Sequence, residues 1–597
     1  MASPRLVLCG SARLSSEAEP WSTLQPLQLR IGRGRGRVHV RIANISRVQA
    51  ARLPDVAADL IEVASYVYAA DQAVSRGGPR EFEYGTRWRR HFRFEIPVRC
   101  PELWRQPAVR GTLEATLGFL SDDDYEFGFS LYRNPVPLQS YLFEAESAAL
   151  GRPFDEVMLF SGGLDSLAGA VINMILGRRK TALVSHRAAT KMFAVQGDLI
   201  QELQRFIPDP RLYPRHVAID VDKGKALTHD FNQRTRSFLF AALGAVVARA
   251  LDLPTLRMYE NGVIAINLPI SPQVLGARAS RTAHPQVLDG FSALFTHLFG
   301  GTFVVDNPFR WDTRTDILKR LRDSGHGGLC ARSVSCVHPI AMTSQHPHCG
   351  RCSQCVDRRL CALAAGLTAA EDPPSGYASN VLIDEHQGTD LTLIERYLGT
   401  VRSVAKLPNP LQFMAVYGEG TRVLRHCGVS AAEAAEKVFR LYRKHAEQIL
   451  DAIGMGFAQY GDLVARDTLI PTSMLGLARG RSYRQPGVTV AASREANAPA
   501  KPPVLLVDRD TFTAHYDGRH CALGNTKEFA LVEFLSQRAG IYVSFDTLGK
   551  VVWDNEDTSR GTIQRTASYL RAALRDHGMS AIDIDGSQRR HLCLTTP

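Results

Sequence analysis

The stretch EVMLFSGGLDSLAGAVINMILG, residues 156–177, joins an apolar run to an amphipathic one through Ser-Gly-Gly. Residues 157–160 are continuously apolar, as in a buried parallel strand, and from Leu164 the apolar residues recur at helical spacing. Gly162 and Gly163 let the backbone turn sharply and present its N–H groups. A strand, a glycine turn and a helix N-terminus bind anions well, because unpaired N–H groups and the helix dipole both face the ligand. A ligand-free connection between strand and helix is the competing interpretation.

Composition limits the classes of protein to which the chain can belong. Its 597 residues suffice for several domains, and its formal net charge of +11 suits nucleic acids and ATP-like anions equally. The longest apolar stretch, 238–248, is too short to span a bilayer, and the first residues lack the hydrophobic core of a secretory signal. Eleven cysteines, several of them clustered, indicate metal ligands in a reducing compartment. We therefore expect a cytoplasmic protein without a membrane segment.

The order of apolar runs after residue 151 predicts an α/β fold. EVMLF, TALVSH, RHVAID, TLRMYE and TFVVD are expected strands, with helical stretches between them. This alternation favours a doubly wound parallel sheet, in which ligands bind beyond the carboxyl ends of the strands. Residues 161–166 fall at such an end. The expected organisation is a β-rich domain at 1–150, the α/β domain at 151–375, a helical region at 376–485, a Pro/Ala-rich linker at 486–503 and a compact domain at 504–597.

The segment 1–150 is expected to be rich in strands and to contain one helix. Apolar residues at helical spacing follow Pro54 and predict that helix. RHFRFEIPV and GTLEATLGFL are expected strands. The basic run at 30–41 is interpreted as an exposed hairpin or loop rather than an arm that binds nucleic acid.

A cysteine cluster follows the α/β pattern. Cys336, Cys349, Cys352 and Cys355 have the spacing C-x12-C-x2-C-x2-C, and Gly350 suits the tight turn between two of them. Four thiolates without an open position predict a structural Zn²⁺ site. Replacement of one sulfur by His338, His346 or His348 is an alternative, as is an iron–sulfur cluster; Cys330 and Cys361 are interpreted as ordinary cysteines.

These two motifs together resemble a known family. SGGLDS is similar to the pyrophosphate loop (PP-loop) of the N-type ATP pyrophosphatases, whose fold is that of the adenine nucleotide alpha hydrolases, and it lacks the Gly-Lys-Ser/Thr of a Walker loop. With the downstream SC…CGxCxxC set, residues 155–365 resemble 7-cyano-7-deazaguanine synthase, the QueC family of queuosine biosynthesis. RTRSFLF (234–240) is similar to an Arg-Ser segment of those enzymes, whereas VSHRAATKMFAVQ (184–196) departs from their pattern and leaves the acceptor pocket open.

The resemblance implies an AMP-forming ligase that uses ATP and Mg²⁺. A 7-deazaguanine carboxylate would be adenylated, converted by ammonia to the amide and then dehydrated to the nitrile. The residues implied for ATP are Ser161, Gly162, Gly163, Leu164, Asp165 and Ser166. Asp165 is the implied Mg²⁺ partner, with a helix-dipole charge as its alternative role. Arg236 is the implied contact to phosphate or substrate, with a surface role on its helix as the alternative.

Other features are similar to QueC-like proteins of bacterial antiviral islands, such as the Qat and type IV CBASS systems. They are the N-terminal domain, the VYAAD segment (67–71) and the SRTAHP segment (280–285). In that setting, a protein amine would replace ammonia as the acceptor of the adenylate. Arg281 and His284 are weaker candidates for the site, with a loop role as the preferred interpretation.

The segment 504–597 resembles the winged-helix domain of OmpR/PhoB-type response regulators. The pattern predicts strands around an Asp517-Gly518 turn, helices at 527–537 and 547–552, a recognition helix from TSRGTIQRTASYLRAALRDHG, and a closing strand. Arg560, Arg565, Arg571 and Arg575 lie along the recognition helix and would face a major groove. With 11 Lys/Arg and 12 Asp/Glu the domain has a net charge of −1, so DNA binding and protein docking both stay open. The alternative function for the whole chain is a nucleotide-sensing, DNA-binding regulator.

Overall fold

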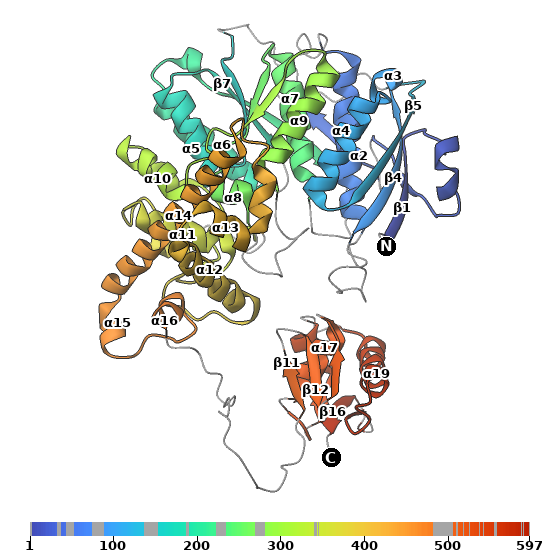
Figure 1. Cartoon of the computed structure of the whole chain (residues 1–597), viewed down its shortest axis with the longest axis vertical. Helices are drawn as coiled ribbons and strands as arrows, with labels where there is room; N and C mark the ends of the chain where they lie inside the picture. The colour runs from blue at the N-terminus through green and yellow to red at the C-terminus, as the bar shows by residue number, and fades with distance from the viewer. Residues whose placement is uncertain are drawn as a thin grey trace. The chain divides into compact units, whose positions relative to one another are not determined.

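The computed structural model describes most of the chain, in two compact units that can be followed by colour in Figure 1. The larger unit is made of Pro4–Ser75 and His91–Gly487, and the smaller chiefly of Val488–Pro597. The described residues are 3–32, 37–42, 53–74, 89–135, 153–186, 190–222, 234–268, 281–338, 343, 345–480 and 505–595 apart from 509–511, 518, 525, 537, 541, 554–557, 587 and 589. The expected linker at 486–503 lies outside them. Among the described helices, none combines the length and apolar character that crossing a membrane requires.

The central sheet of the larger unit has the strand order β10-β9-β6-β7-β8-β3. Its five parallel strands are the five runs expected from the sequence: β6 (Glu156–Leu159), β7 (Thr181–His186), β8 (Arg215–Asp222), β9 (Thr255–Arg257) and β10 (Val304–Asp306). From β6 the chain proceeds outward to β7 and β8, and it then crosses to the other side of β6 for β9 and β10. The prediction of an α/β fold around a parallel sheet is confirmed at this level.

Helices cover both faces of the central sheet, because successive side chains of a strand point to opposite faces. Val157 packs in one hydrophobic core with Val184, whereas Met158 packs in a second core with Leu183. The first core contains residues of α7 (Arg236–Ala250) and α9 (Pro285–Phe299). The second contains residues of α5 (Leu164–Ala170), the π-helix Val171–Leu176, α6 (Thr190–Arg205), α10 (Arg314–Asp323) and α11 (Ser353–Ala364).

The N-terminal part contains a second sheet, of order β2-β1-β4-β5. Its strands are β1 (Ser3–Cys9), β2 (Leu27–Leu29), β4 (Arg90–Val98) and β5 (Asp124–Leu131), and its helices are α2 (Asp55–Ala73), α3 (Pro101–Trp104) and α4 (Pro107–Ser121). Helix α2 packs on α7 and α4 packs on α9, so that helices lie between the two sheets (Figure 1). Residues of both sheets therefore share one hydrophobic core.

One prediction for this part is wrong and a second is wrong in part. GTLEATLGFL is not a strand but lies within α4, whose buried Val109, Leu113, Leu117 and Leu120 recur every three or four residues. Pro107 occupies the first turn of this helix, where a proline is well tolerated; the helical period was masked by the short β-prone ending LGFL. In addition, the basic run at 30–41 fits the expected exposed hairpin or loop only in part. Arg30 and Gly32 form backbone bonds with Val38, but residues 39–41 belong to β3 (His39–Ile42), which pairs antiparallel with β8 at the edge of the central sheet.

Residues 376–480 are predominantly helical, as expected. The helices are α12 (Gly388–Lys406), α13 (Pro410–Val416), α14 (Ala431–Gln459), α15 (Gly461–Ala465) and α16 (Met474–Ala478), after the short α8 (Gly262–Ile266) of the α/β part. Short 3₁₀ helices are found at Ser16–Trp21, Pro210–Leu212, Gly327–Arg332, Pro374–Gly376 and Gly418–Val423. Helix α14 packs against both α11 and α12, so the helical region extends the second core of the sheet.

The smaller unit has a hydrophobic core of its own and the strands and helices expected for a winged-helix domain. Its elements are β11 (Leu506–Asp508), β12 (Thr513–Tyr516), β13 (Arg519–Ala522), α17 (Lys527–Ser536), β14 (Val543–Ser544), α18 (Phe545–Val552), α19 (Arg560–Asp576), β15 (Asp583–Asp585) and β16 (His591–Thr595). Tyr516 pairs with Arg519 across the two-residue turn, and Asp517 has a φ of +50°. The order of helices and strands predicted for this domain is confirmed.

Candidate functional site

The glycine turn after β6 forms a small hydrogen-bonded loop. Gly162 has a φ of +81°, a conformation that residues with a Cβ rarely adopt. The Ser161 hydroxyl lies 3.1 Å from the Ser166 hydroxyl and accepts a 3.2 Å hydrogen bond from the Gly163 N–H, while Ser166 Oγ donates to Gly163 O at 3.0 Å. Ser161 is exposed and Gly163 partly exposed, whereas Leu164 is buried and anchors the start of α5. Two hydroxyls and a backbone N–H are therefore gathered at a partly accessible turn.

The position of this loop in the sheet matters as much as its hydrogen bonds. Residues 161–166 follow the strand from which the chain turns to β7 on one side and later to β9 on the other. The order β8-β7-β6-β9-β10 is that of doubly wound folds, in which ligands bind outside the carboxyl ends of the strands where the direction of winding reverses. The loop lies at this switch point, as expected for the carboxyl end of the first strand.

Asp165 is buried and both of its carboxylate oxygens have protein partners. Arg314 Nε and Nη2 lie 3.3 Å from Oδ1 and Oδ2, and Asn261 donates to Oδ2 through its backbone N–H at 3.2 Å and its side chain at 2.8 Å. Arg314 also bonds to Asp357 at 2.5 Å, so one guanidinium joins two carboxylates. The implied Mg²⁺ contact of Asp165 stays a prediction. In this conformation its carboxylate connects the start of α5 to Asn261 and Arg314.

Arg236 and Glu260 come from two further strand ends. Arg236 begins α7 after β8, is exposed, and stacks over Phe240 with 5.6 Å between its guanidinium carbon and the ring centre. Glu260 follows β9, and its backbone is held by Asn307 through bonds of 3.2 and 2.7 Å. Burial, and next the charge of Asp165, raises the pKa of Glu260 to about 7, while Arg314 and Arg236 oppose the rise. Charged groups from three strand ends thus act on one another here.

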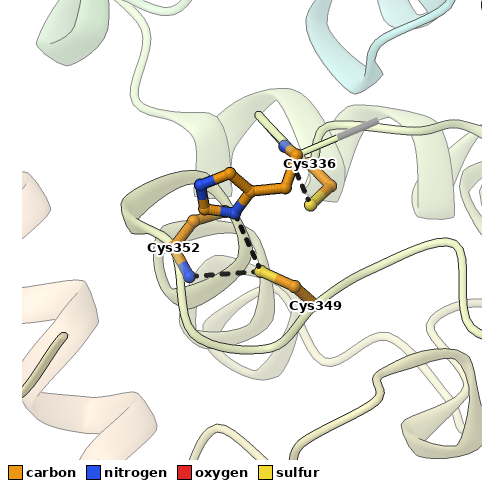
Figure 2. A group of neighbouring side chains, drawn as sticks. Cys336, Cys349 and Cys352 are labelled. Carbon is orange, nitrogen blue, oxygen red and sulfur yellow. Dashed lines mark hydrogen bonds between the residues drawn. The ribbon is translucent and has the colours of Figure 1, made fainter. Parts of the chain in front are cut away.

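The four predicted cysteines form one cluster together with His338. Ligand atoms of Cys336, His338, Cys349 and Cys352 all lie within 4.8 Å of one another, and Cys355 Sγ is 3.8 Å from Cys349 Sγ. Figure 2 shows Cys336, Cys349 and Cys352 gathered close together. Nδ1 of His338 lies 3.7 Å from Cys349 Sγ. Such a set of sulfur and imidazole donors fits Zn²⁺, which prefers these ligand types in structural sites.

The three histidines that could replace a cysteine as a metal ligand have different contacts in the structure. His338 Nδ1 contacts Cys349, and this contact raises the pKa of His338. His346 Nδ1 bonds to Ser375 O at 3.0 Å, and the buried His348 stacks on Tyr377 with ring centres 4.9 Å apart. His338 is therefore the histidine placed to act as a ligand.

The cysteine cluster adjoins the glycine loop. Val334 N–H, two residues before Cys336, donates to Gly162 O at 3.1 Å. Arg358 of α11 donates to Ser333 Oγ at 2.8 Å and to Cys330 O at 2.6 Å, which fixes the segment between them. The two predicted motifs, far apart in the sequence, are therefore neighbours.

Sequence reasoning did not identify Asn261, Arg314 and Asp357, which hold the loop. Nothing in the local sequence marks Arg314 or Asp357, since both lie on amphipathic helices of ordinary composition. Glu260 and Asn261 carried a usable signal, because polar residues directly after a predicted strand lie at the ligand-binding edge of a parallel sheet.

Arg281 and His284 have structural roles away from the loop. Arg281 is buried, donates to Phe119 O at 2.5 Å, and has its guanidinium 4.5 Å from the centre of that ring. The buried His284 caps α9 by accepting the Gln286 N–H on Nδ1, at 3.2 Å. The preferred interpretation of both as loop residues agrees with this geometry.

Helix α19 presents a polar face to solvent. The exposed residues of this face recur at helical spacing and include Gln564, Arg565, Ser568 and Arg575. Arg560, at the first position of the helix, is exposed as well. Three of the four arginines predicted along the recognition helix are therefore accessible from solvent.

Arg571 differs from the other three. Its Nε donates to Ile584 O at 2.7 Å and lies 3.5 Å from Asp583 Oδ1. The Arg571 side chain thus connects α19 to β15. It does not face outward as the prediction of a contact with the major groove requires.

Comparisons with known proteins identify the C-terminal domain only. Residues 520–586 match the family described as "Transcriptional regulatory protein, C terminal". No curated protein matches the chain. Among solved structures, a ketoreductase domain from the bacillaene assembly line is 10% identical over 51% of this chain and 78% of its own, with a TM-score of 0.18. An N-terminal ketoreductase from the macrolactin assembly line is 8% identical over the same shares, also with a TM-score of 0.18. Scores this low carry no argument about fold or function.

Proposed function

We propose that residues 151–375 form a PP-loop ATP pyrophosphatase domain that activates a carboxylate by adenylation, as the resemblance to 7-cyano-7-deazaguanine synthase implies. The observation that carries this proposal is the position of the SGGLDS loop at the winding reversal of the parallel sheet. The adjoining cluster of thiols supports it, because the resemblance rests on both motifs. The substrate that we propose is a 7-deazaguanine carboxylate.

The proposed chemistry has two steps. A carboxylate oxygen attacks the α-phosphorus of ATP and expels pyrophosphate. Ser161, Ser166 and the Gly163 N–H, which lie together in the loop, are the donors that we propose for the pyrophosphate. An amine then attacks the acyl carbon, its extra proton is lost, and AMP leaves. Glu260 suits the role of proton acceptor, because a carboxyl group with a pKa of about 7 is half ionised at neutral pH. When bound, Mg²⁺ would neutralise the phosphate charge, with Asp165 as its proposed partner.

In this proposal Zn²⁺ has a structural role. Cys336, Cys349, Cys352 and Cys355 are the proposed ligands, with His338 as the replacement for one of them. Zinc bound by thiolates and imidazole would stabilise a segment that adjoins the loop. A reduced thiol cluster also favours the cytoplasm as the place of action.

Pyrophosphate release from ATP in the presence of the deazapurine acid tests the proposal. We expect Ser161→Ala and Asp165→Asn to slow release about a hundredfold, as loss of a charge-stabilising contact does elsewhere. Ser324→Ala and Asp312→Asn, at positions that flank α10, are the matched controls and should release pyrophosphate at the wild-type rate. Wild-type rates in the two loop variants would refute the site, and no release from the wild type would refute the reaction.

The acceptor of the adenylate is a separate question. Ammonia would yield the amide and, after a second ATP-dependent activation that removes water, the free nitrile. A protein amine would instead yield a covalent adduct, as expected for the antiviral setting. Incubation with ATP, the acid and ammonium, followed by mass spectrometry, separates the two. Abundant free nitrile supports ammonia, and modified protein without nitrile supports the protein acceptor.

The match of residues 520–586 favours a second activity, DNA binding by the C-terminal domain. We propose that α19 inserts its solvent face into the major groove, with the exposed Arg560 and Arg565 directed at DNA. The double change Arg560→Ala and Arg565→Ala should weaken binding in a gel-shift assay. The slope of log affinity against log salt concentration should become shallower by about one for each phosphate that an arginine no longer neutralises.

The control for this assay is Arg538→Ala, which removes an arginine stacked on Phe534 of α17 and keeps α19 intact. It should bind DNA as the wild type does, with the same dependence on salt. Unchanged binding by the double variant would instead favour protein docking.

A further inference from the structure

Helix α11 connects the cysteine cluster to the glycine loop through one arginine. Cys352 occupies the N-cap position of the helix, and Gln354, Cys355 and Asp357 lie in the turn and a half that follows. Arg314 of α10 donates at 3.1 Å to Gln354 Oε1 and at 2.5 Å to Asp357 Oδ2. Two of the four cysteines and both of these Arg314 partners therefore lie on the same turn and a half of helix.

The other edge of the same guanidinium holds the loop. Arg314 Nε and Nη2 are 3.3 Å from the carboxylate of Asp165, the second residue of α5. Only 4% of the Arg314 side chain is exposed, and the side chains of Asp165 and Asp357 are 9% and 7% exposed. A planar guanidinium between two buried carboxylates has little freedom to move without breaking a buried ion pair.

A second connection runs along the backbone. Val334 N–H bonds to Gly162 O, and the segment just before it is fixed by Arg358 of α11. Displacement of α11 would therefore act on the glycine loop at two points, its first glycine and its aspartate.

We propose that Arg314 is a positioning residue that couples metal binding at the cysteine cluster to nucleotide binding at residues 161–166. Loss of the metal would remove the bonds that hold Cys352 and Cys355 at the start of α11. The resulting shift of Gln354 and Asp357 would move Arg314 and Asp165 with them. By linkage, a nucleotide that stabilises the loop also stabilises the metal site. The nucleotide half of this inference rests on the proposed function; the metal half does not.

Transfer of zinc from the full-length protein to a chromogenic chelator, with and without Mg-ATP, tests the coupling. In the wild type, Mg-ATP should slow zinc loss about fivefold or more, the lower end of coupling between sites. Arg314→Lys keeps the buried positive charge but cannot bridge both carboxylates. It should lose zinc about fivefold faster without nucleotide, and Mg-ATP should not slow that loss. The control Arg320→Gln, on the same helix but paired with Asp312 at the surface, should behave as the wild type.

Separate outcomes address the coupling and the proposed function. Equal zinc loss from Arg314→Lys and Arg320→Gln would overturn the coupling, whatever ATP does. Equilibrium dialysis that detects no ATP on the wild type would refute the proposed function, while faster zinc loss from Arg314→Lys would still support the link from α11 to the loop. Should circular dichroism find Arg314→Lys unfolded, Gln354→Ala, which spares both ion pairs, takes its place with the same expected direction.

Discussion

Gly350 illustrates how one residue can decide whether the cysteine cluster forms. Its φ is +77°, and a Cβ at this position would collide with Ser379 O. We expect Gly350→Ala to lose most of its bound zinc after dialysis, measured by metal analysis, because the Cys349–Cys352 turn cannot close around it. Gly399→Ala is the control, since a Cβ there meets open space on α12 and should leave the zinc content unchanged. Full zinc retention by Gly350→Ala would contradict this account of the turn.

His284 predicts a dependence of stability on pH. Burial, and next the charge of Arg281, lowers the pKa of His284 from its ordinary 6.5 to about 3. As the pH falls below 6.5, His284 therefore binds a proton in the unfolded chain but stays neutral in the folded chain until the pH nears 3. The contribution of this residue to stability is complete above pH 6.5 and is lost progressively as the pH falls toward 3.

The test is His284→Asn, which keeps an acceptor for the Gln286 N–H at the start of α9 but does not titrate. Between pH 7 and pH 5, the wild type should lose about 2 kcal/mol more of its free energy of unfolding than the variant. Denaturant melts at the two pH values measure the difference. An equal loss of unfolding free energy in both proteins would mean that protonation of His284 does not destabilise the folded chain.

At the scale of elements, the arginines of α19 are of two kinds, one in a structural contact and three exposed to solvent. Arg571 is fastened to β15 through Ile584 O, whereas Arg560, Arg565 and Arg575 are exposed. We expect Arg571→Ala to destabilise the winged-helix domain by about 1 kcal/mol, the usual net value of a hydrogen bond. Arg565→Ala should leave the melting temperature of the domain unchanged. Thermal melts followed by circular dichroism compare the two, and an equal effect of both changes would contradict the assignment.

At the scale of the whole molecule, the hydrophobic cores predict two melting units. The cores of the larger unit contain no described residue beyond 478, and the core of the smaller unit is built from residues 505–594. We expect two transitions in calorimetry of the full chain, because independent cores unfold independently. A fragment of residues 1–487 should keep one transition and lose the other. A single transition for the full chain that vanishes in the fragment would contradict this prediction.

Features with local signals could be predicted from the order of residues alone. Residues 156–177 carry a strand, a left-handed glycine and a helix start in one short run, and the five parallel strands also follow from period and turn residues. The winged helix was expected from the resemblance of residues 504–597 to a known family. The spacing of the four cysteines likewise placed their thiols together. Such signals are readable because the residues that carry each of them lie close together in the chain.

The contacts between these elements could not be predicted from the sequence and are seen only in the tertiary structure. In the structure, GTLEATLGFL is part of a helix that packs on α9, and β3 pairs at the edge of the central sheet. Arg314 lies between Asp165 and Asp357 and bonds to both. The partners of Arg314 are 149 and 43 residues away in sequence. Contacts of that kind are selected by burial and charge pairing in the folded core, and no local pattern encodes them, because the same arginine on an exposed face would be an ordinary surface residue.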